Sequence, residues 1–381
     1  MTLILAAAPL FSGTAESGTP ALKAEELFTD RDMQQEADLN GATAITLESG
    51  REIRIDSAGV YVLSGMASEA TVTVEAGDDD KVQLVLNGIT VANTGFPVIY
   101  VKSADKVFVT TAADSSLSVT GTFTSDGNTK TDGVIFSKAD LTLNGTGTLT
   151  IASTDNGIVG KDDLKITGGT YEIRAASKTV EANDSIRIAD GTLNLTAGTD
   201  GLHAENSEDS SAGNIYIGGG NLAISAGDDA IHAACVVQVD GGTVRAAAAE
   251  GIEGTYIQIN GGTISIQASD DGINAARKSS AYTPTVEING GDITVAMGAG
   301  DTDGIDSNGN IIINGGMIQV TGNSTFDYDG TAQLNGGTII ANGREVTEIP
   351  NQMMGGRGGW GSQNGNNGRG GSGGGRGRRG W

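Results

Sequence analysis

Short runs of alternating apolar and polar residues fill most of this chain. In the segment INGGTISI, Ile264 and Ile266 would face one side of an extended strand, and Thr263 and Ser265 would face the other. The same alternation precedes the two glycines, and a third apolar position, here Ile273, follows an acidic residue. Each unit of this kind therefore predicts three short strands separated by corners.

The unit recurs nine times between about residues 141 and 342. The second glycine of successive corners, or its equivalent, is separated by steps of 22, 22, 29, 22, 20, 29, 25 and 21 residues. Such steps are too short for a domain, so each unit predicts one coil of a solenoid. Asparagine and glycine suit the corners because both tolerate positive φ. The corner glycines are Gly147, Gly169, Gly191, Gly220, Gly242, Gly262, Gly291, Gly316 and Gly337.

The pattern favours an all-β fold, a parallel β-helix with three short strands per coil. A leucine-rich repeat has a similar length, but it would need a helical segment and a leucine frame that these units lack. Ankyrin and other helical repeats conflict with the period of two, and the nonapeptide calcium roll has a far shorter unit.

Four regions follow from changes in this pattern. Residues 1–27 are interpreted as a signal remnant and linker, and residues 28–131 as an N-terminal cap and early coils. Residues 132–350 form the regular repeats, and residues 351–381 a disordered tail rich in glycine, asparagine and arginine. The apolar start lacks a basic region but is followed by small residues, which predicts a secreted or cell-surface protein. A disordered leader on a cytoplasmic protein is the alternative.

The chain is strongly acidic, with a formal net charge of −24. Such a surface repels nucleic acid and membrane headgroups and attracts cations, so we expect neither nucleic-acid binding nor membrane insertion. No segment reaches the roughly 18 to 20 apolar residues of a transmembrane helix.

The single cysteine, Cys235, excludes a disulfide within the chain. We expect a monomer.

An acidic residue occupies one position in five successive units. Stacked coils lie about 4.8 Å apart, so these acids would form a column and repel one another by roughly 3 to 4 kcal/mol at an effective dielectric near 20. Calcium binds six to eight oxygens at about 2.3 to 2.6 Å, which places oxygens across one ion roughly 4.6 to 5.2 Å apart. The column is Asp200, Asp229, Glu250, Asp271 and Asp303.

Further acids near the same corner would complete the calcium ligands. They are Asp228, Asp270 and Asp301 from the corner, and Glu253 and Asp306 from the polar position three residues after the column. Calcium is preferred over magnesium because a stack of corners offers irregular geometry, which the larger ion tolerates. The alternative is that Asp-Gly recurs only because both residues favour tight turns, and that the column of acids is exposed to solvent and binds no ion.

The two histidines, His203 and His232, occupy that polar position on adjacent coils, beside Asp200 and Asp229. Contact with sugar hydroxyls, binding of zinc or another borderline metal, and plain stacking remain open for them. Lys178 interrupts the acidic column one coil earlier. We include Lys178 with the histidines as candidate carbohydrate-binding residues.

The N-terminal part carries a family resemblance. It contains FTDRDMQ from Phe28, GVYVLSG from Gly59, VQLVLNGITV from Val82 and PVIYVKSADKV from Pro97. Over roughly residues 28 to 345, the chain resembles a family of secreted bacterial β-helix proteins named carbohydrate-binding domain-containing proteins. The resemblance implies a right-handed parallel β-helix similar to pectate lyases, with binding of calcium, cellulose and acidic plant polysaccharide. It carries over no catalytic residue.

The expected function is therefore calcium-dependent binding of plant cell-wall polysaccharide, above all an acidic polygalacturonate-like glycan and secondly cellulose. A calcium-dependent polysaccharide lyase is one alternative, since it would combine metal ions with a basic residue. Arg174, Arg187, Arg245, Arg277 and Lys278 lie near the acidic column in sequence, but no motif distinguishes them. A structural adhesin on the cell surface is the other alternative.

Overall fold

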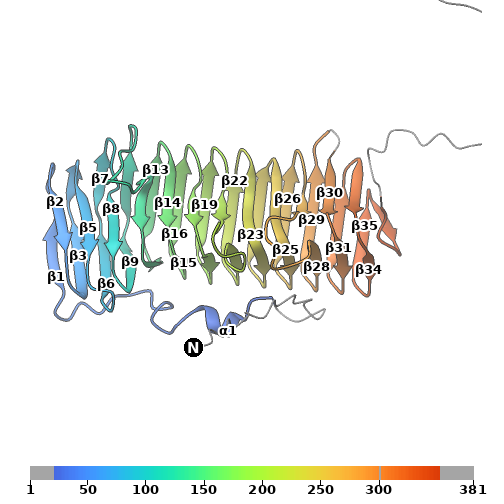
Figure 1. Cartoon of the computed structure of the whole chain (residues 1–381), viewed down its shortest axis with the longest axis horizontal. Helices are drawn as coiled ribbons and strands as arrows, with labels where there is room; N and C mark the ends of the chain where they lie inside the picture. The colour runs from blue at the N-terminus through green and yellow to red at the C-terminus, as the bar shows by residue number, and fades with distance from the viewer. Residues whose placement is uncertain (1–20, 300–301, 352–381) are drawn as a thin grey trace, which may run out of the picture.

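The protein is described by a computed structural model that covers residues 21–299 and 302–351. These residues form one elongated solenoid of stacked, parallel strands (Figure 1). They contain 36 strands and one short helix, α1 (Ala24–Leu27). The predicted parallel β-helix is confirmed. The described part contains no helix long and apolar enough to cross a membrane.

Each coil contributes strands to three faces, and the strands of each face pair in parallel from coil to coil. The first face consists of β2 (Glu52–Ile55), β5 (Thr71–Glu75), β8 (Ile99–Ser103), β11 (Gly133–Ser137), β14 (Asn156–Gly160), β17 (Val180–Ala182), β20 (Leu202–Ala204), the first halves of β23 (Asp229–Val239) and β25 (Glu250–Ile259), β27 (Ile273–Ala275), β30 (Asp303–Ser307) and β33 (Ser324–Tyr328).

The second face consists of β1 (Thr43–Thr46), β3 (Gly59–Ser64), β6 (Lys81–Asn87), β9 (Lys106–Ala113), β12 (Asp140–Gly145), β15 (Asp163–Ile166), β18 (Ser185–Ile188), β21 (Asn214–Ile217), the second halves of β23 and β25, β28 (Thr285–Ile288), β31 (Asn310–Ile313) and β34 (Ala332–Leu334). Because β23 and β25 run through the corner, the first and second faces form one continuous sheet of 23 strands.

The third face is a separate sheet of 13 strands. It consists of β4 (Met66–Ser68), β7 (Thr90–Asn93), β10 (Ser115–Val119), β13 (Thr148–Ser153), β16 (Thr170–Ala175), β19 (Thr192–Ala197), β22 (Asn221–Ser225), β24 (Thr243–Ala248), β26 (Thr263–Ala268), β29 (Asp292–Met297), β32 (Met317–Thr321), β35 (Thr338–Ala341) and β36 (Arg344–Val346). The last strand, β36, pairs antiparallel with β35 and ends the regular stacking.

The core is a continuous column of aliphatic side chains inside the coils. In β26, Ile264 and Ile266 are buried while Thr263 and Ser265 are exposed, as the alternation predicted. Ile273 is also buried and pairs with equivalent residues of the coils on either side. Full burial of one such side chain contributes about 1.5 to 3 kcal/mol, and it does so only when neighbouring coils are in place.

Glycine at the corners has the expected conformation in eight of the nine predicted positions. Gly262, for example, has φ 91°, and a Cβ added there would lie 3.0 Å from the carbonyl oxygen of Gly242. The prediction was wrong at Gly147, because in that coil Gly145 adopts the positive φ, at 123°. The corners are further joined by side-chain amides: Asn289 Nδ2 donates to Asn260 Oδ1 at 2.7 Å.

An N-terminal segment, residues 21–35, runs along the outside of the second face and is called the strap below (Figure 1). At one end, the backbone nitrogen of Ala21 donates to Gln258 Oε1 at 2.8 Å. At the other end, Gln35 Nε2 donates to the carbonyl oxygen of Thr167 at 3.0 Å. Of the region interpreted as signal remnant and linker, residues 21–27 thus contact the solenoid, and residues 1–20 lie outside the described residues.

Asp32 fixes the strap to the solenoid and is fully buried. Its carboxylate oxygens lie 2.6 Å from Lys106 Nζ and 3.3 Å from Lys165 Nζ, and one accepts a hydrogen bond from Thr142 Oγ1 at 3.0 Å. Burial by itself would raise the pKa of Asp32, but the hydrogen bond and charge of Lys106, with help from Lys165, hold it far below its usual value. The buried ionic triad of Asp32, Lys106 and Lys165, with the hydrogen bond from Thr142, therefore joins three coils to the strap.

Candidate functional site

The predicted acidic column lies at the start of the first-face strands. Asp229 pairs directly with Glu250, and the register of the flanking strands places Asp200 on one side and Asp271 and Asp303 on the other. Lys178 occupies the same position in the coil before Asp200. The inference that these side chains share one line along the solenoid was thus correct.

Part of the role of this column is structural. Asp200 Oδ1 accepts a hydrogen bond from the backbone nitrogen of Asp229 at 3.3 Å, and Asp271 Oδ1 accepts one from that of Asp303 at 3.1 Å. Asn156 makes the same contact with the backbone nitrogen of Lys178 at 3.1 Å. Each side chain thereby accepts a hydrogen bond from a backbone N–H of the next coil. Without this acceptor, that N–H group would have no partner at the corner, which is unfavourable for a buried backbone donor.

A second polar column runs three residues further along the same strands. Glu181, His203, His232 and Glu253 are paired in register in successive coils. The two imidazole rings are stacked, with centroids 4.6 Å apart and planes 9° apart. His203 Nδ1 lies 2.8 Å from Asp200 Oδ2. The sequence correctly placed both histidines beside their aspartates.

His232 is held between two carboxylates. Its Nδ1 lies 2.8 Å from Asp229 Oδ2 and 2.7 Å from Glu253 Oε2. Burial would lower the pKa of His232, but the hydrogen bonds to Asp229 and Glu253 outweigh it and raise the pKa to about 9. The imidazole is therefore charged at neutral pH and partly neutralises the acids around it.

Lysines neutralise two acids of the second polar column, Glu181 and Glu253, in the central coils. Lys161 Nζ and Lys178 Nζ lie 3.0 and 3.3 Å from the two oxygens of Glu181, and Lys278 Nζ lies 2.8 Å from Glu253 Oε1. Lys178, predicted to contact carbohydrate, thus forms an ion pair within the chain. Around Glu181 and Glu253 the protein itself supplies the compensation that we expected from calcium, whereas burial and the charges of Glu253 and Asp229 raise the pKa of Glu250 to about 8.

The C-terminal coils lack this compensation. Within residues 21–299 and 302–351, no lysine or arginine forms an ion pair with Asp271, Asp303, Asp306 or Asp327. The Asp306 carboxyl has its pKa raised to about 7 by burial and then by the charges of Asp271, Asp303 and Asp327. Burial, with the neighbouring acids, likewise raises the pKa of Asp271 to about 6.

Several buried oxygens here also lack hydrogen-bond donors. Considering the described residues, none donates to Asn274 Oδ1, Asp303 Oδ1 or Asp327 Oδ1. Asn274 uses its Nδ2 to donate to Glu250 Oε2 at 3.1 Å, which leaves its carbonyl oxygen without a partner. These oxygens are close together, and among the described residues no lysine or arginine side chain neutralises them. A hard metal ion such as calcium binds to oxygen ligands arranged in this way.

The remaining candidate ligands lie elsewhere or are not described. Asp228 and Asp270 are exposed on the corner, one residue before the column. Asp301 lies outside the described residues. Sequence reasoning missed Asp327, which pairs with Asp306 in the next coil; the polar residue after Phe326 was a usable signal.

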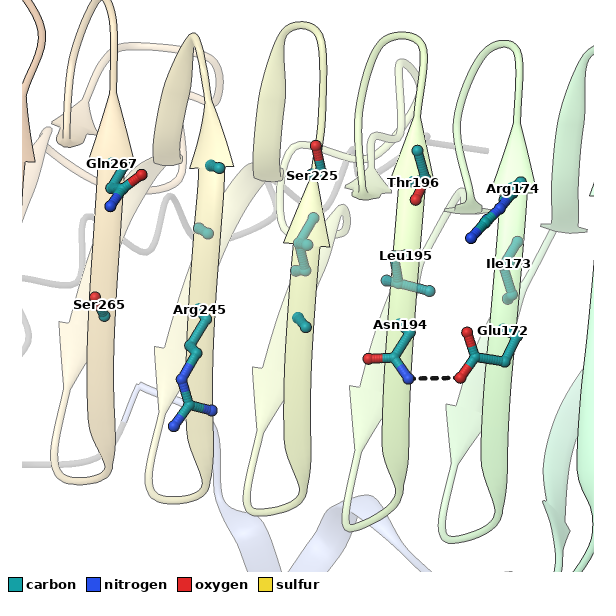
Figure 2. A pocket seen from close by; sticks show the side chains of 14 residues that line it. Glu172, Ile173, Arg174, Asn194, Leu195, Thr196, Ser225, Arg245, Ser265 and Gln267 are labelled. Atoms are coloured by element: carbon teal, nitrogen blue, oxygen red, sulfur yellow. Dashed lines mark hydrogen bonds between the residues drawn. The ribbon is translucent and has the colours of Figure 1, made fainter.

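A separate groove of about 450 Å³ lies on the outer surface of the third face (Figure 2). Its floor consists of small side chains, among them Ala223, Ser225 and Ala247. The exposed guanidinium groups of Arg174 on β16 and Arg245 on β24 lie on opposite sides of this floor. In the described part of the chain, neither arginine forms an ion pair.

Strand register explains how the groove arises. Glu172, Asn194, Ala223, Arg245 and Ser265 are neighbours in one outward row, and Asn194 Nδ2 donates to Glu172 Oε1 at 2.6 Å (Figure 2). A parallel row carries the second arginine. Both arginines are near the acidic column in sequence, but they lie on a different face of the solenoid.

The fold and these two surfaces define a class, an acidic parallel β-helix. A solved structure described as a polysaccharide lyase-like protein from C. thermocellum, in a gadolinium derivative, has a TM-score of 0.52 and 31% sequence identity to this chain. That likeness covers 59% of this chain and 96% of the neighbour.

The family model for carbohydrate-binding domain-containing proteins matches residues 49–301 and again residues 250–345. The chain belongs to this family. A relative with the same description, from Acetivibrio thermocellus, is 36% identical over 132 residues. That match spans 33% of this chain and 46% of the relative, less than half of its length. The resemblance found in the sequence is thus confirmed.

Proposed function

We propose that this protein binds an acidic, polygalacturonate-like polysaccharide along the outside of its β-helix, with calcium as its cofactor. The observation that carries the proposal is the groove flanked by Arg174 and Arg245 on an otherwise acidic protein. A planar guanidinium pairs with a carboxylate through two parallel hydrogen bonds, which suits a polymer bearing one carboxylate per sugar. The small side chains between the arginines leave room for sugar rings.

The tyrosines favour an acidic glycan over cellulose. Binding of a flat neutral glycan usually relies on exposed aromatic rings, for which the repeats offer Tyr171, Tyr216, Tyr256 and Tyr328. Tyr171 is in the core, and Tyr216 and Tyr256 are buried, so three of these four rings offer no stacking surface. Charge recognition is therefore the stronger basis for binding here.

Calcium is proposed for the C-terminal coils. Asp271, Asp303, Asp306 and Asp327, with Asn274 Oδ1, supply the oxygens, and the donor-free atoms described above support a cation among them. One calcium ion would offset the mutual repulsion of these acids. The central acids Asp200, Asp229 and Glu253 are less suitable, because His203, His232 and Lys278 each place a nitrogen 2.8 Å from one of them. Among the described residues, Glu250 has no such partner.

Export is proposed from the family and the apolar start. That start falls within residues 1–20, which lie outside the described residues. An acidic plant polysaccharide is an extracellular polymer, so a secreted or surface location agrees with the proposed ligand. Proteolysis of intact cells compared with lysed cells would test the location.

The experiment for binding compares retention on immobilised polygalacturonate with and without calcium. We expect Arg174→Ala with Arg245→Ala to weaken retention by about tenfold or more, since hydrogen bonds to charged groups contribute roughly 1.5 to 3 kcal/mol. The matched control is Arg277→Ala with Arg344→Ala, which removes the same charge from exposed positions outside the groove. Equal retention of the two double variants would refute the groove as the binding site.

The same incubation separates binding from cleavage. A lyase would generate unsaturated uronate products, detected by growing ultraviolet absorbance that depends on calcium. We expect retention without that growth. Absorbance growth would favour the lyase alternative, and a wild-type protein without retention or cleavage would leave the adhesin.

A further inference from the structure

The two stacked histidines share an arrangement that a calcium site does not use. His203 on β20 and His232 on β23 each direct Nδ1 toward the carboxylate three residues earlier in the chain, at 2.8 Å in both cases. Because the rings are nearly parallel, both Nε2 atoms lie on the same, opposite side. Glu205 Oε2 lies 3.4 Å from His203 Nε2.

We propose that His203, His232 and Glu205 form a binding site for a borderline divalent transition metal of the zinc class. One ligand atom from each of the three residues lies within 4.8 Å of the other two. Neutral imidazole nitrogen is a preferred ligand of zinc, whereas calcium takes oxygen ligands. Zinc would therefore displace the second ring proton that His232 carries at neutral pH. Two imidazoles and one carboxylate form a three-ligand set that leaves a fourth position open.

The carboxylates behind the rings strengthen this assignment. Histidines that bind metals almost always donate the other ring N–H to a carboxylate or carbonyl, which fixes the tautomer and directs the free nitrogen to the metal. Asp229 and Glu253 both accept from His232 Nδ1, at 2.8 and 2.7 Å. Asp200 Oδ2 lies 2.8 Å from His203 Nδ1, close enough for the same contact once the ring tilts. Both aspartates are buried, so each imidazole is oriented by a rigid part of the coil rather than by a surface loop.

Small movements would bring the ligands to bonding distance. Zinc binds nitrogen and oxygen at about 2.0 to 2.2 Å, so the two rings must tilt from their parallel stack until their Nε2 atoms converge. Glu205 is free to follow, since its side chain is 58% exposed. The open coordination position would face a hollow of about 540 Å³ that His203 and Glu205 line together with Lys161, Asn206 and Glu208.

Isothermal titration of the untagged, calcium-saturated chain with zinc chloride tests the proposal. We expect one site in the wild type, and at least tenfold weaker binding after His203→Asn or His232→Asn, which keep a polar side chain of similar shape. Asp200→Asn should weaken binding by about 10- to 100-fold without removing a ligand, as loss of an orienting partner does. Melting curves would confirm that each variant remains folded.

A crossed control separates this site from the proposed calcium site. Asp303→Asn with Asp306→Asn should reduce calcium binding and leave the zinc affinity unchanged. Zinc binding that survives replacement of both histidines, or a wild-type chain that binds no zinc below millimolar concentrations, would overturn the proposal. Because polygalacturonate is absent from this titration, neither result depends on the proposed function.

Discussion

Asp32→Ala should destabilise the β-helix by about 3 to 5 kcal/mol, because the substitution leaves two buried lysines without their counter-charge. Lys106 and Lys165 are each 7% exposed, and Asp32 is the residue that both contact in ion pairs. Thr142 would also lose its hydrogen-bond acceptor. Urea denaturation followed by circular dichroism measures the change in the free energy of unfolding.

Two further variants test whether the loss of stability in Asp32→Ala comes from the unpaired lysines. Asp30→Ala removes an exposed carboxylate from the same strap and should change the free energy of unfolding by no more than about 0.5 kcal/mol. Adding Lys106→Met and Lys165→Met to Asp32→Ala should recover much of the loss, since apolar replacement of a buried ionic cluster is often neutral. Equal urea midpoints for Asp32→Ala and Asp30→Ala would contradict the proposed importance of the triad.

In calcium-free buffer, the protein should become less stable as the pH rises from 5 to 8. The pKa of Asp271 is raised to about 6 and that of Asp306 to about 7, chiefly by burial and then by neighbouring carboxylates. In this range the folded state therefore binds more protons than the unfolded chain, and stability falls with pH, by a few kcal/mol in total. His232, with its pKa raised to about 9, acts in the same direction.

Calcium should reverse this dependence, since it stabilises the ionised carboxylates that destabilise the calcium-free protein. The melting temperature at pH 8 should rise on addition of millimolar calcium, and much less so at pH 5. Asp306→Asn should raise the calcium-free melting temperature at pH 8 and reduce the response to calcium. Asp56→Asn, an exposed change of equal charge near the other end, should do neither. A melting temperature unaffected by calcium at pH 8 would exclude this role.

The fold could be predicted because its signals are local. Alternation at Ile264 and Ile266 sets the side-chain directions, and a glycine at each corner sets the turn. Gly147 was assigned wrongly because its corner reads Gly145-Thr146-Gly147 in place of Gly-Gly, and the first of these glycines takes the positive φ.

The site was only half predictable, because its chemistry depends on contacts between distant segments. The alignment of Asp200 with Asp229 follows from the repeat, but the approach of Lys278 to Glu253 depends on the path of a loop. Likewise, Arg174 and Arg245 share a groove only because every intervening coil keeps the strand register of the third face.

The strap was missed for a related physical reason. A segment that packs on the outside of a sheet needs no periodicity of its own, and Asp32 looks like an ordinary surface acid in the sequence. Its lysine partners, Lys106 and Lys165, also occupy outward positions where charged residues are common. Only the three-dimensional path of residues 21–35 brings these charges together.

The strap changes how such a molecule should unfold. In most solenoids each coil touches only its neighbours, so the ends can unravel while the middle stays intact. Here a single segment contacts coils from β9, through Asp32 and Lys106, to β25, through Ala21 and Gln258. The strap thereby connects coils that do not contact one another. Unfolding of any one of these coils would remove part of the contact surface that holds the strap. We therefore expect the coils between β9 and β25 to unfold together rather than one at a time.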